Sequence, residues 1–550
     1  MGEPSIVLRN SFFMTGDVII LHRAAAGTSV ADVLGEVRTE LASAFEGENP
    51  LNGNEELISR WNNNEYFQVT QTAVAEETYS IVKFSAADDH RSENEYVPSD
   101  TFEPENFTTI QTVLAFRQAA RESESVQGVL LNWLSGASQG RPIGTGGSGA
   151  KPVALTGTPF YKPAFPGIGS LSTSTFVKVF VLDTAPSVGR IHQAQTSFPN
   201  HPLLNNLFGT GNHFTIHYNP LQYSTTQSLM EFINDWEVDH HFYDMSDHGT
   251  FIAGLIDSAL RTRDIQYQID LLQVLGDKGV GSVESILWGL LQVLAESLAN
   301  PTDAYVVNCS FTLTTPRLPG SGQALHISET PAPDAAFIRQ LEDLDIDLED
   351  LLSLDVLENI FEVITRRRVG FKSLATNIAV VAAAGNQGRS PTTNDRFDAG
   401  YPAAFNTVFG VSALDDADQP ASYSNRADEP ISDGFAIIGG ESNGGIFSLS
   451  SAQLATNPTP PSINDAIAGL YLAPFPDPTD LDPDSTATVA NTVGWAYWSG
   501  TSFAAPLVSA AVAIHLAAGQ TPSLAAQLLQ NGSPGLTIDN EWIIDATLEP

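Results

Sequence analysis

Residues 176–183 read FVKVFVLD, a short apolar run that ends in a carboxylate. Runs of the same kind recur further along the chain, and they are IDLLQVLG (269–276), AYVVNCSF (304–311), IAVVAAAGN (378–386) and TVFGVSAL (407–414). Strands that are apolar along their whole length are typical of a parallel sheet covered by helices on both faces. Between two of these runs, Ser282 and Pro301 bracket a stretch with the pattern of such a helix. The sequence therefore predicts an α/β layered domain from about residue 173 onward.

The composition excludes several classes of protein. The chain has 550 residues, 42% of them apolar, which is enough for roughly two to four domains. It carries 25 Lys and Arg against 64 Asp and Glu, a net charge of −39 that repels phosphate backbones, so we expect no nucleic-acid partner. The single cysteine, Cys309, excludes an intrachain disulfide and a cysteine-rich zinc site.

The sequence contains no obvious membrane or export signal. No run of about 20 apolar residues is present, so we expect no transmembrane helix and no membrane partner. The first residues lack the basic stretch and apolar core of a secretory signal peptide. These patterns favour a cytoplasmic location and leave non-classical export open.

The composition changes along the chain in a way that predicts three segments. Residues 1–138 alternate strand-like and helix-like stretches and predict a small α+β domain. Residues 139–172 are rich in Gly, Ser and Pro, have no hydrophobic period and predict a linker. Residues 173–550 hold the α/β domain, in which residues 314–370 and 440–490 have the composition of insertions.

Polar side chains stand where four of the apolar segments end or begin. Asp183 ends the first apolar run, Asn386 ends IAVVAAAGN, and His248 lies in MSDHGTFIAG at the start of an apolar helix. Ser502 lies in SGTSFAAP at the start of another, where Pro506 is tolerated close to the first turn. Singly, each residue has an ordinary explanation as a turn or a helix cap. In an open parallel sheet, however, functional groups collect at the carboxyl ends of the strands.

Together and in this order, the motifs resemble the signature of the subtilisin-like serine proteases, or subtilases. VLDT matches the aspartate motif of that family, HGTFIAG its histidine motif, SGTSFAAP its serine motif and AAAGN its oxyanion asparagine. The resemblance covers about residues 173–545. It implies a three-layer subtilisin-like α/β domain with a mostly parallel central sheet. It also implies a serine endopeptidase that hydrolyses peptide bonds in protein or peptide substrates through an acyl-enzyme.

The resemblance implies a catalytic role for each of these residues. Ser502 would be the nucleophile, activated by His248 as general base and then acid. Asp183 would orient the imidazole, and Asn386 would donate to the oxyanion together with the backbone N–H of Ser502. The residues implied in substrate binding are Ser310, Phe311, Thr312, Ala383, Ala384 and Gly385.

Two positions depart from the family pattern. Residues 308–313 read NCSFTL where the family tends to have a Ser-Leu-Gly-Gly-like edge for pairing with the substrate, so we expect an altered specificity pocket. Phe251 replaces the second histidine common in the histidine motif, which we interpret as a packing change.

The N-terminal segment resembles the propeptide of many subtilases. Residues 116–134 predict a helix followed by a strand just upstream of the linker. The hypothesis is that residues 1–138 inhibit the enzyme and that it cuts the linker itself. The alternative is a stable accessory domain that is never removed.

Other motifs are weaker. Ser138 lies in GASQG, which fits a nucleophile elbow, but the helix that an elbow requires does not follow. Residues 144–149, GTGGSG, lack the strand and helix of a dinucleotide loop. His213 and His217 lie in a strand-like stretch without a zinc-binding pattern. An esterase that uses Ser138, and a subtilase scaffold that captures peptides without cutting them, remain as alternative functions.

The sequence identifies no required cofactor. The start of a calcium-binding loop is imitated by Asp480, Asp482 and Asp484. Ser485 stands where such a loop needs glycine, and Asn491 where it needs glutamate, so an acidic loop is favoured. The family resemblance allows calcium, for which the sequence gives no position.

Overall fold

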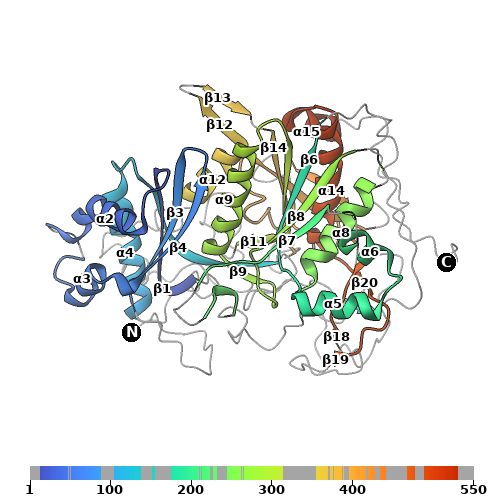
Figure 1. The fold of residues 1–550 in the computed structure, drawn as a ribbon, viewed down its shortest axis with the longest axis horizontal. Coiled ribbons are helices and arrows are strands. Elements are labelled where there is room, and N and C mark those ends of the chain that lie inside the picture. Colours follow the sequence, from blue (N-terminus) through green and yellow to red (C-terminus); the bar gives the residue numbers. More distant parts are fainter. Residues whose placement is uncertain are drawn as a thin grey trace.

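The computed structural model describes residues 13–47, 49, 51–87, 104–137, 152–154, 175–209, 211, 213–222, 227–231, 244–261, 263, 265–313, 355–369, 372–375, 377–386, 388, 396–415, 419–427, 434–440, 467–476 and 488–530. Figure 1 shows two large sheets with a helical layer between them, the first sheet built from the start of the chain. Within the described ranges, no helix combines the length and apolar character that crossing a bilayer requires.

The second sheet is the predicted parallel sheet. Its strands in spatial order are β16 (Phe435–Ile438), β15 (Val408–Leu414), β14 (Ile378–Ala383), β10 (Ala304–Cys309), β6 (Val177–Asp183), β8 (Tyr267–Gln273) and β7 (Phe214–His217). All neighbouring strands run parallel. Every residue of β6, β10 and β14 is buried, which explains why their sequences are apolar without alternation.

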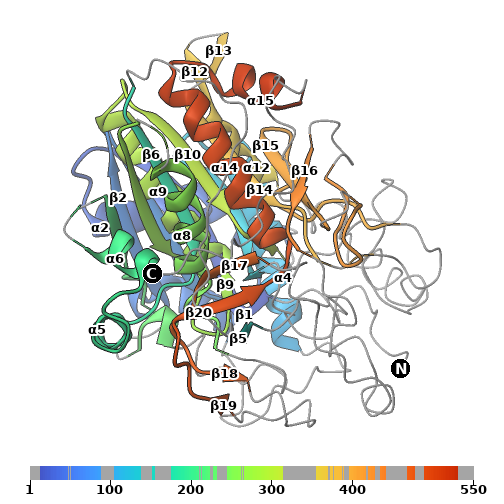
Figure 2. The same cartoon turned by 90° about the vertical axis from the view of Figure 1, so that its right-hand side faces the viewer.

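Helices cover both faces of this sheet and give three layers (Figures 1 and 2). On one face lie α8 (His248–Arg261) and α14 (Thr501–Ala517), which also pack against each other. On the other lie α9 (Val283–Ala299) and α12 (Asp355–Thr365). The shorter helices are α5 (Val188–Ser197), α6 (Pro202–Phe208) and α15 (Pro522–Gln530). The predicted α/β class and layering are confirmed.

The start of α9 follows from its sequence. The Ser282 side chain accepts a hydrogen bond from the Ser285 N–H, and the Ser285 hydroxyl accepts one from the Ser282 N–H. This reciprocal pair satisfies two N–H groups that the first helical turn would otherwise leave without partners. The cap predicted at Ser282 is confirmed.

The first sheet is antiparallel and belongs to the α+β unit predicted for the start of the chain. Its strands in spatial order are β4 (Val126–Ala137), β1 (Phe13–Ala25), β3 (Glu77–Ser85) and β2 (Phe67–Val74). The helices of this unit are α2 (Val30–Glu40), α3 (Glu55–Asn62) and α4 (Pro104–Ala120), with the 3-10 turns η1 (Ala42–Phe45) and η2 (Asn64–Tyr66). The opposite face of the sheet packs on α9, which therefore lies between the two sheets (Figure 1).

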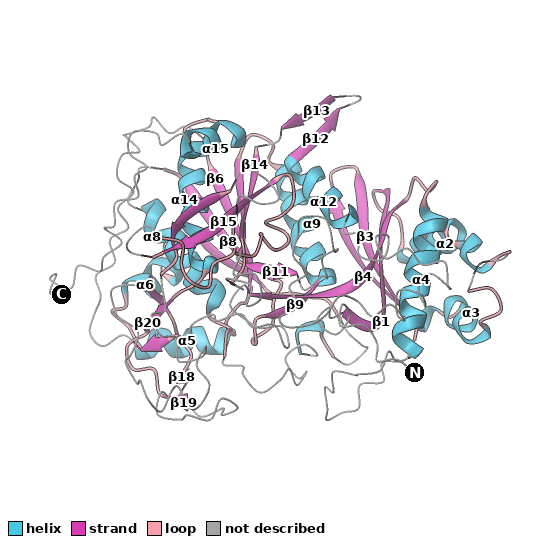
Figure 3. Ribbon diagram, turned by 180° about the vertical axis from the view of Figure 1, so that it is seen from behind, coloured by secondary structure: helices cyan, strands magenta, loops and turns pink. Residues whose placement is uncertain are grey.

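Strand β4 continues beyond its own sheet and reaches the α/β body, as Figure 3 shows. There it pairs antiparallel with β9 (Val280–Ser282) and with β11 (Phe311–Leu313). The end of β4 is thus the middle strand between two edges that belong to the second part of the chain.

Small strand pairs complete the described structure. They are β17 (Ile467–Leu470) with β20 (Trp495–Trp498) and β5 (Val153–Ala154), β12 (Arg366–Val369) with β13 (Lys372–Ala375), and β18 (Phe475–Pro476) with β19 (Thr488–Val489). Parts of the two predicted insertions therefore have defined roles: α12 packs on α9 and β14, and β17 packs on α8.

Candidate active site

The structure brings Asp183 and His248 into direct contact. Asp183 is the last residue of β6, and His248 is the first residue of α8. Nδ1 of His248 donates to Oδ1 of Asp183 at 2.7 Å, and both side chains are fully buried. A second bond to the same carboxylate oxygen, from the Thr184 N–H at 2.7 Å, holds Asp183 in place. The pair fixes the imidazole tautomer, with the proton on Nδ1 and the lone pair on Nε2.

The other face of His248 is aromatic. The imidazole centroid lies 5.4 Å from the ring centroids of both Trp498 and Phe503, the residue after Ser502. Nε2 is buried and makes no hydrogen bond within the described part of the chain. This nitrogen can therefore accept a proton.

Ser502 lies in the first turn of α14 and is fully buried. Its hydroxyl donates to the carbonyl oxygen of Ser310 at 3.2 Å, so it makes no hydrogen bond to His248 in this structure. Catalytic hydrogen bonds are often loose or absent in the free state of an enzyme and form only with substrate.

A buried polar chain fixes the backbone of Ser502. Ser509 donates to Asn308 Oδ1, Asn308 Nδ2 donates to the Ser310 hydroxyl, and this hydroxyl donates to the Ser502 carbonyl, each at 2.9 Å. Sequence reasoning missed Asn308 and Ser509. The available signal was a polar residue inside an apolar strand and a serine two helical turns after Ser502, on the same face of α14.

Asn386 is also positioned from α14. Its Oδ1 accepts hydrogen bonds from the N–H of Thr501 at 3.0 Å and from the Thr501 hydroxyl at 2.9 Å. Because the amide oxygen faces Thr501, the amide nitrogen points away from it. The side chain of Asn386 is almost fully buried, and its contacts to Thr501 place it against the first turn of the helix that carries Ser502.

The residues predicted to bind substrate fall into two environments. Phe311 and Thr312 lie on β11, opposite Ala137 and Gly136 of β4, and Phe311 is fully buried. Ala384 is engaged within the fold: its N–H donates to Val411, and its carbonyl accepts from Gly400 and from the Asn425 side chain. The remaining three residues lie next to the site. The Ser310 hydroxyl donates to the Ser502 carbonyl, and the Gly385 N–H donates to the Thr501 hydroxyl. Ala383 is the last residue of β14.

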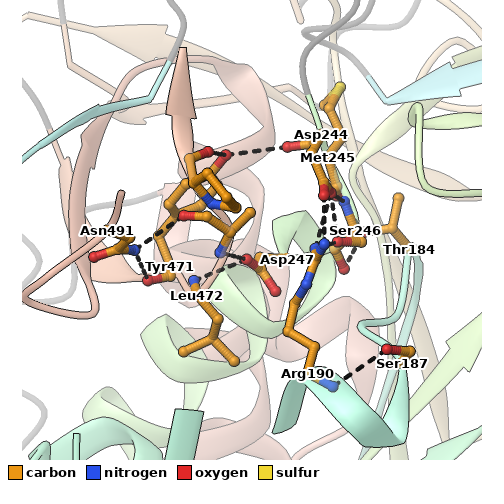
Figure 4. Close-up of polar contacts among 12 residues, drawn as sticks. Thr184, Ser187, Arg190, Asp244, Met245, Ser246, Asp247, Tyr471, Leu472 and Asn491 are labelled. Carbon is orange, nitrogen blue, oxygen red and sulfur yellow. Dashed lines mark hydrogen bonds and ion pairs between the residues drawn. The ribbon is translucent and has the colours of Figure 1, made fainter. Parts of the chain in front are cut away.

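The segment before His248 is held by polar contacts that the sequence did not predict (Figure 4). The Thr184 hydroxyl donates to the carbonyls of Met245 at 2.8 Å and Ser246 at 3.1 Å. Arg190 forms an ion pair with Asp244 at 2.5 Å and also contacts the Ser246 hydroxyl. These contacts tie residues 244–246 to the chain that follows Asp183.

Close packing of α8 against the end of β6 explains why glycine follows His248. A Cβ at this position would lie 2.2 Å from the carbonyl oxygen of Thr184 and 3.0 Å from the Cβ of Asp183. Any side chain would therefore push α8 away from β6 and lengthen the contact between His248 and Asp183.

The other candidates lie in structural roles or outside the described residues. His213 pairs with Asp257 at 2.8 Å and His217 with Asp270 at 3.1 Å. Ser138, residues 144–149 and the aspartates of 480–484 lie outside the described ranges. Burial raises the pKa of the Cys309 thiol, which keeps it protonated and unreactive. Among the residues that the structure describes, no group of three or more His, Cys, Asp or Glu is arranged to hold a metal.

Comparisons with known proteins add one decisive result. The search of curated proteins gives no match. The chain is similar to a solved structure described as "Crystal Structure of a Lanthipeptide Protease", at 16% identity over 65% of this chain and 79% of that chain, but the TM-score of 0.33 is too low to support an argument. A family model described as "Subtilase family" matches residues 175–531, well over half of the chain. The chain therefore belongs to the subtilase family, and it is a serine endopeptidase.

Proposed function

We propose that Asp183, His248 and Ser502 form the catalytic triad of this enzyme, with Asn386 as an oxyanion donor. The observation that carries the proposal is the buried hydrogen bond of 2.7 Å between Asp183 and His248, beside the helix whose first turn holds Ser502. Structural ion pairs also bury carboxylates and imidazoles, but they do not combine this contact with a serine at an adjacent helix start.

The reaction follows from these positions. As the Ser502 hydroxyl attacks the substrate carbonyl, its proton passes to Nε2 of His248, and Asp183 stabilises the imidazolium. The negative oxygen that forms on the substrate accepts hydrogen bonds from the Ser502 N–H, at the positive end of α14, and from the Asn386 amide. His248 then protonates the departing amine. Water, deprotonated by the same imidazole, releases the acyl group and restores Ser502.

The pairing of β4 supports extended peptides as substrates. Antiparallel addition to a sheet edge recognises a peptide through its main chain. Ala137 lies opposite Phe311, one residue from Ser310, whose carbonyl oxygen accepts the Ser502 hydroxyl. A peptide bound between β9 and β11 in the place of β4 would lead its next carbonyl toward Ser502.

The same contact supports the proposal that residues 1–138 are an inhibitory domain and that the enzyme cuts the linker after β4. The contact between this domain and the α/β body extends to buried charges: Lys83 Nζ lies 3.4 Å from Glu284 Oε2, and the Glu284 N–H donates to Asn132 at 3.1 Å. Comparing the wild type with Ser502→Ala by intact mass distinguishes this hypothesis from a permanent accessory domain. A wild type that is fully active and uncut would overturn it.

The proposed chemistry uses only protein groups, so we also propose that hydrolysis needs no cofactor. Addition of EDTA should leave kcat unchanged. If calcium binds to this chain, EDTA should instead lower the Tm, which separates a structural ion from a catalytic one.

The triad is tested by labelling with a fluorophosphonate, followed by mass spectrometry of the peptides. We expect modification of Ser502 in the wild type, growing as self-processing proceeds, and none in Ser502→Ala. A label on Ser138 would indicate the esterase alternative. A folded, processed chain without any label would indicate a scaffold that captures peptides without cutting them.

A further inference from the structure

The residue before His248 makes contacts that the triad does not require. The Asp247 side chain is fully buried, and its Oδ2 accepts hydrogen bonds from the backbone N–H groups of Leu472 at 2.8 Å and Ala473 at 2.5 Å (Figure 4). Both donors follow β17, more than 220 residues later in the chain. A carboxylate that accepts two backbone N–H bonds at these distances forms strong, charge-assisted contacts.

Asp247 is also the residue on which α8 begins. Its carbonyl oxygen accepts from the Phe251 N–H at 2.8 Å, the first bond of the helix, and the helix starts at His248. Residues at this position usually turn their side chain back onto their own helix. Asp247 instead binds a different segment, so it couples the start of α8 to the loop after β17.

That loop is itself anchored. Asn491 donates to the carbonyls of Tyr471 at 2.7 Å and Ala473 at 3.1 Å, and the Tyr471 hydroxyl donates to the carbonyl of Asp244 at 3.1 Å. Residues 471–473 are therefore held in place by Asn491 and are tied to Asp244. A segment held in this way can fix the position of Asp247 and, with it, that of His248.

The charged groups that face Asp247 come from every neighbouring segment. Arg190 of α5 attracts it, whereas Asp244 repels it, and Asp277 adds a further carboxylate beside Arg190 and Asp244. Burial, with the repulsion of Asp244, raises the pKa of Asp247 to about 6 in spite of Arg190 and the two N–H donors. Oδ1 is buried and accepts no hydrogen bond within the described residues. At neutral pH Asp247 thus carries a negative charge that is only partly compensated.

We propose that Asp247 is a positioning residue for His248: it fixes the start of α8 on the backbone of Leu472 and Ala473, and its charge favours the imidazolium that forms during catalysis. The inference rests on the proposed triad and adds a second carboxylate to it. Asp183 acts on the imidazole through Nδ1, whereas Asp247 acts through the backbone and through space. No proton is transferred to or from Asp247 in the reaction.

The charge and the contacts have separable effects. Removing a negative charge next to an imidazole makes protonation of that imidazole harder, so the fall in rate on the acid side should move to lower pH. For charges on neighbouring residues, screened as at a typical protein site, we expect a displacement of about 0.5 to 1 pH unit in Asp247→Asn. The contacts are tested by Asp247→Glu. Loss of the two strong contacts in this variant loosens the position of His248 and should lower the labelling rate at the plateau about tenfold.

The test is the pH dependence of the rate at which a fluorophosphonate labels Ser502, measured on the full chain after its activity has become constant. The variants are Asp247→Asn, Asp247→Glu and, as a control, Asp257→Asn. Asp257 is a buried carboxylate on the same helix, about 15 Å further along the helix axis, and its charge is compensated by Arg261 and His213, so it acts on His248 only weakly. We expect the acid limb to move only in Asp247→Asn. Asp247→Glu should keep the position of the limb and lose plateau rate, because its longer side chain cannot keep both backbone contacts.

Each outcome decides between the two proposals. A wild type that is labelled at Ser502, with an acid limb that stays in place in Asp247→Asn, would overturn the role of Asp247 alone. An equal displacement in Asp257→Asn would overturn it as well, since the effect would then be structural. If Asp247→Asn does not fold, Asp247→Ser replaces it, because serine is also a preferred residue at the N-cap of a helix. Full wild-type rate in Asp247→Glu would overturn the positioning role, and absence of any label at Ser502 would overturn the triad and this inference together.

Discussion

At the scale of single residues, the site combines two kinds of buried polar group. His248 Nδ1 and Asp183 Oδ1 satisfy each other, whereas His248 Nε2 and Asp183 Oδ2 are buried and have no hydrogen-bond partner within the described residues. A buried polar atom without a partner is destabilising, so its presence beside a serine at a helix start points to a group that gains its partner only during the reaction.

The first prediction concerns the triad and its oxyanion donor. Ser502→Ala and His248→Ala should each lower kcat about a million-fold, because either change removes the nucleophilic step. Asn386→Ala should lower kcat roughly a hundred- to a thousand-fold, because the Ser502 N–H still binds the oxyanion. Single-turnover hydrolysis of a chromogenic peptide measures these losses. Asn308→Ala is the informative comparison, since it should perturb Ser502 only indirectly, through Ser310 and Ser509, and a loss as large as that of Ser502→Ala would contradict the assignment.

The second prediction is the pH dependence of the wild type. The imidazole must be neutral to accept the serine proton, so kcat/KM should rise as the pH passes about 6 to 7. Initial rates between pH 5 and 9, with the enzyme returned to pH 8 afterwards to confirm reversibility, measure this limb. A flat profile would contradict His248 as the base.

At the scale of elements, helix starts position most of the site. Ser502 and His248 occupy the first turns of α14 and α8, and these two helices pack on each other over the carboxyl ends of β6, β10 and β14. The start of the smaller helix α6 likewise contacts another element, the strand β20. Its cap, His201, accepts a hydrogen bond from the Leu204 N–H at 3.2 Å and stacks on Trp495 with the ring centroids 4.3 Å apart.

The third prediction follows from that cap. Burial lowers the pKa of His201 to about 4, so the folded protein holds it neutral while the unfolded chain, with an ordinary value near 6.5, takes up a proton. Its contribution is fully present above pH 6.5 and is lost as the pH falls toward 4, a difference of about 3 kcal/mol in the free energy of unfolding. Urea unfolding at pH 7 and pH 4.5, in a Ser502→Ala background that prevents autolysis, measures it.

The control for this prediction is His201→Asn, which keeps a side-chain hydrogen-bond acceptor at the cap, an amide oxygen in place of Nδ1, and removes the titrating group. The variant should lose less stability on acidification than its parent. An identical loss in both proteins would show that other groups carry the pH dependence.

At the scale of the whole molecule, the first sheet and the α/β body meet along α9 and at the end of β4. The Lys83–Glu284 pair lies within this contact, with both side chains almost completely buried. Burial raises the pKa of Glu284, and Lys83 opposes that rise. Removing one partner of a buried ion pair leaves an uncompensated charge and usually costs about 3–5 kcal/mol.

The fourth prediction is therefore that Lys83→Met weakens the association between residues 1–138 and the rest of the chain. If residues 1–138 inhibit the enzyme and are cut from it, as proposed, activity should then appear at least about 100-fold sooner than in the wild type, because β4 leaves its place between β9 and β11 faster. Progress curves with a chromogenic peptide measure the lag. Arg23→Met is the matched control, because its pair with Glu77 at 3.8 Å is exposed and should contribute little. Equal lags in Lys83→Met and wild type would contradict the prediction.

The local features of this protein were determined by its sequence. Fully apolar strands require burial on both faces, so β6, β10 and β14 predict a covered parallel sheet, and Ser282 predicts the start of α9 by its capping chemistry. The four motifs gave the candidate site residues because each motif lies at the end of a strand or the start of a helix, where short sequences control backbone conformation. These features depend on residues that are close together in the chain.

The contacts between distant segments were decided only by the tertiary structure. The resemblance to a propeptide predicts that the last strand of residues 1–138 occupies the substrate cleft, but the sequence does not give the pairing of β4 with β9 and β11. Nothing beside Asp247 indicates that its carboxylate binds the backbone of Leu472. Backbone N–H groups are chemically the same at every residue, so the partner of a strand edge or a buried carboxylate is selected by the packing of whole elements. For this reason the candidate residues of the site could be named from the sequence, while the register of β4 between β9 and β11 and the contact of Asp247 with Leu472 and Ala473 came only from the tertiary structure.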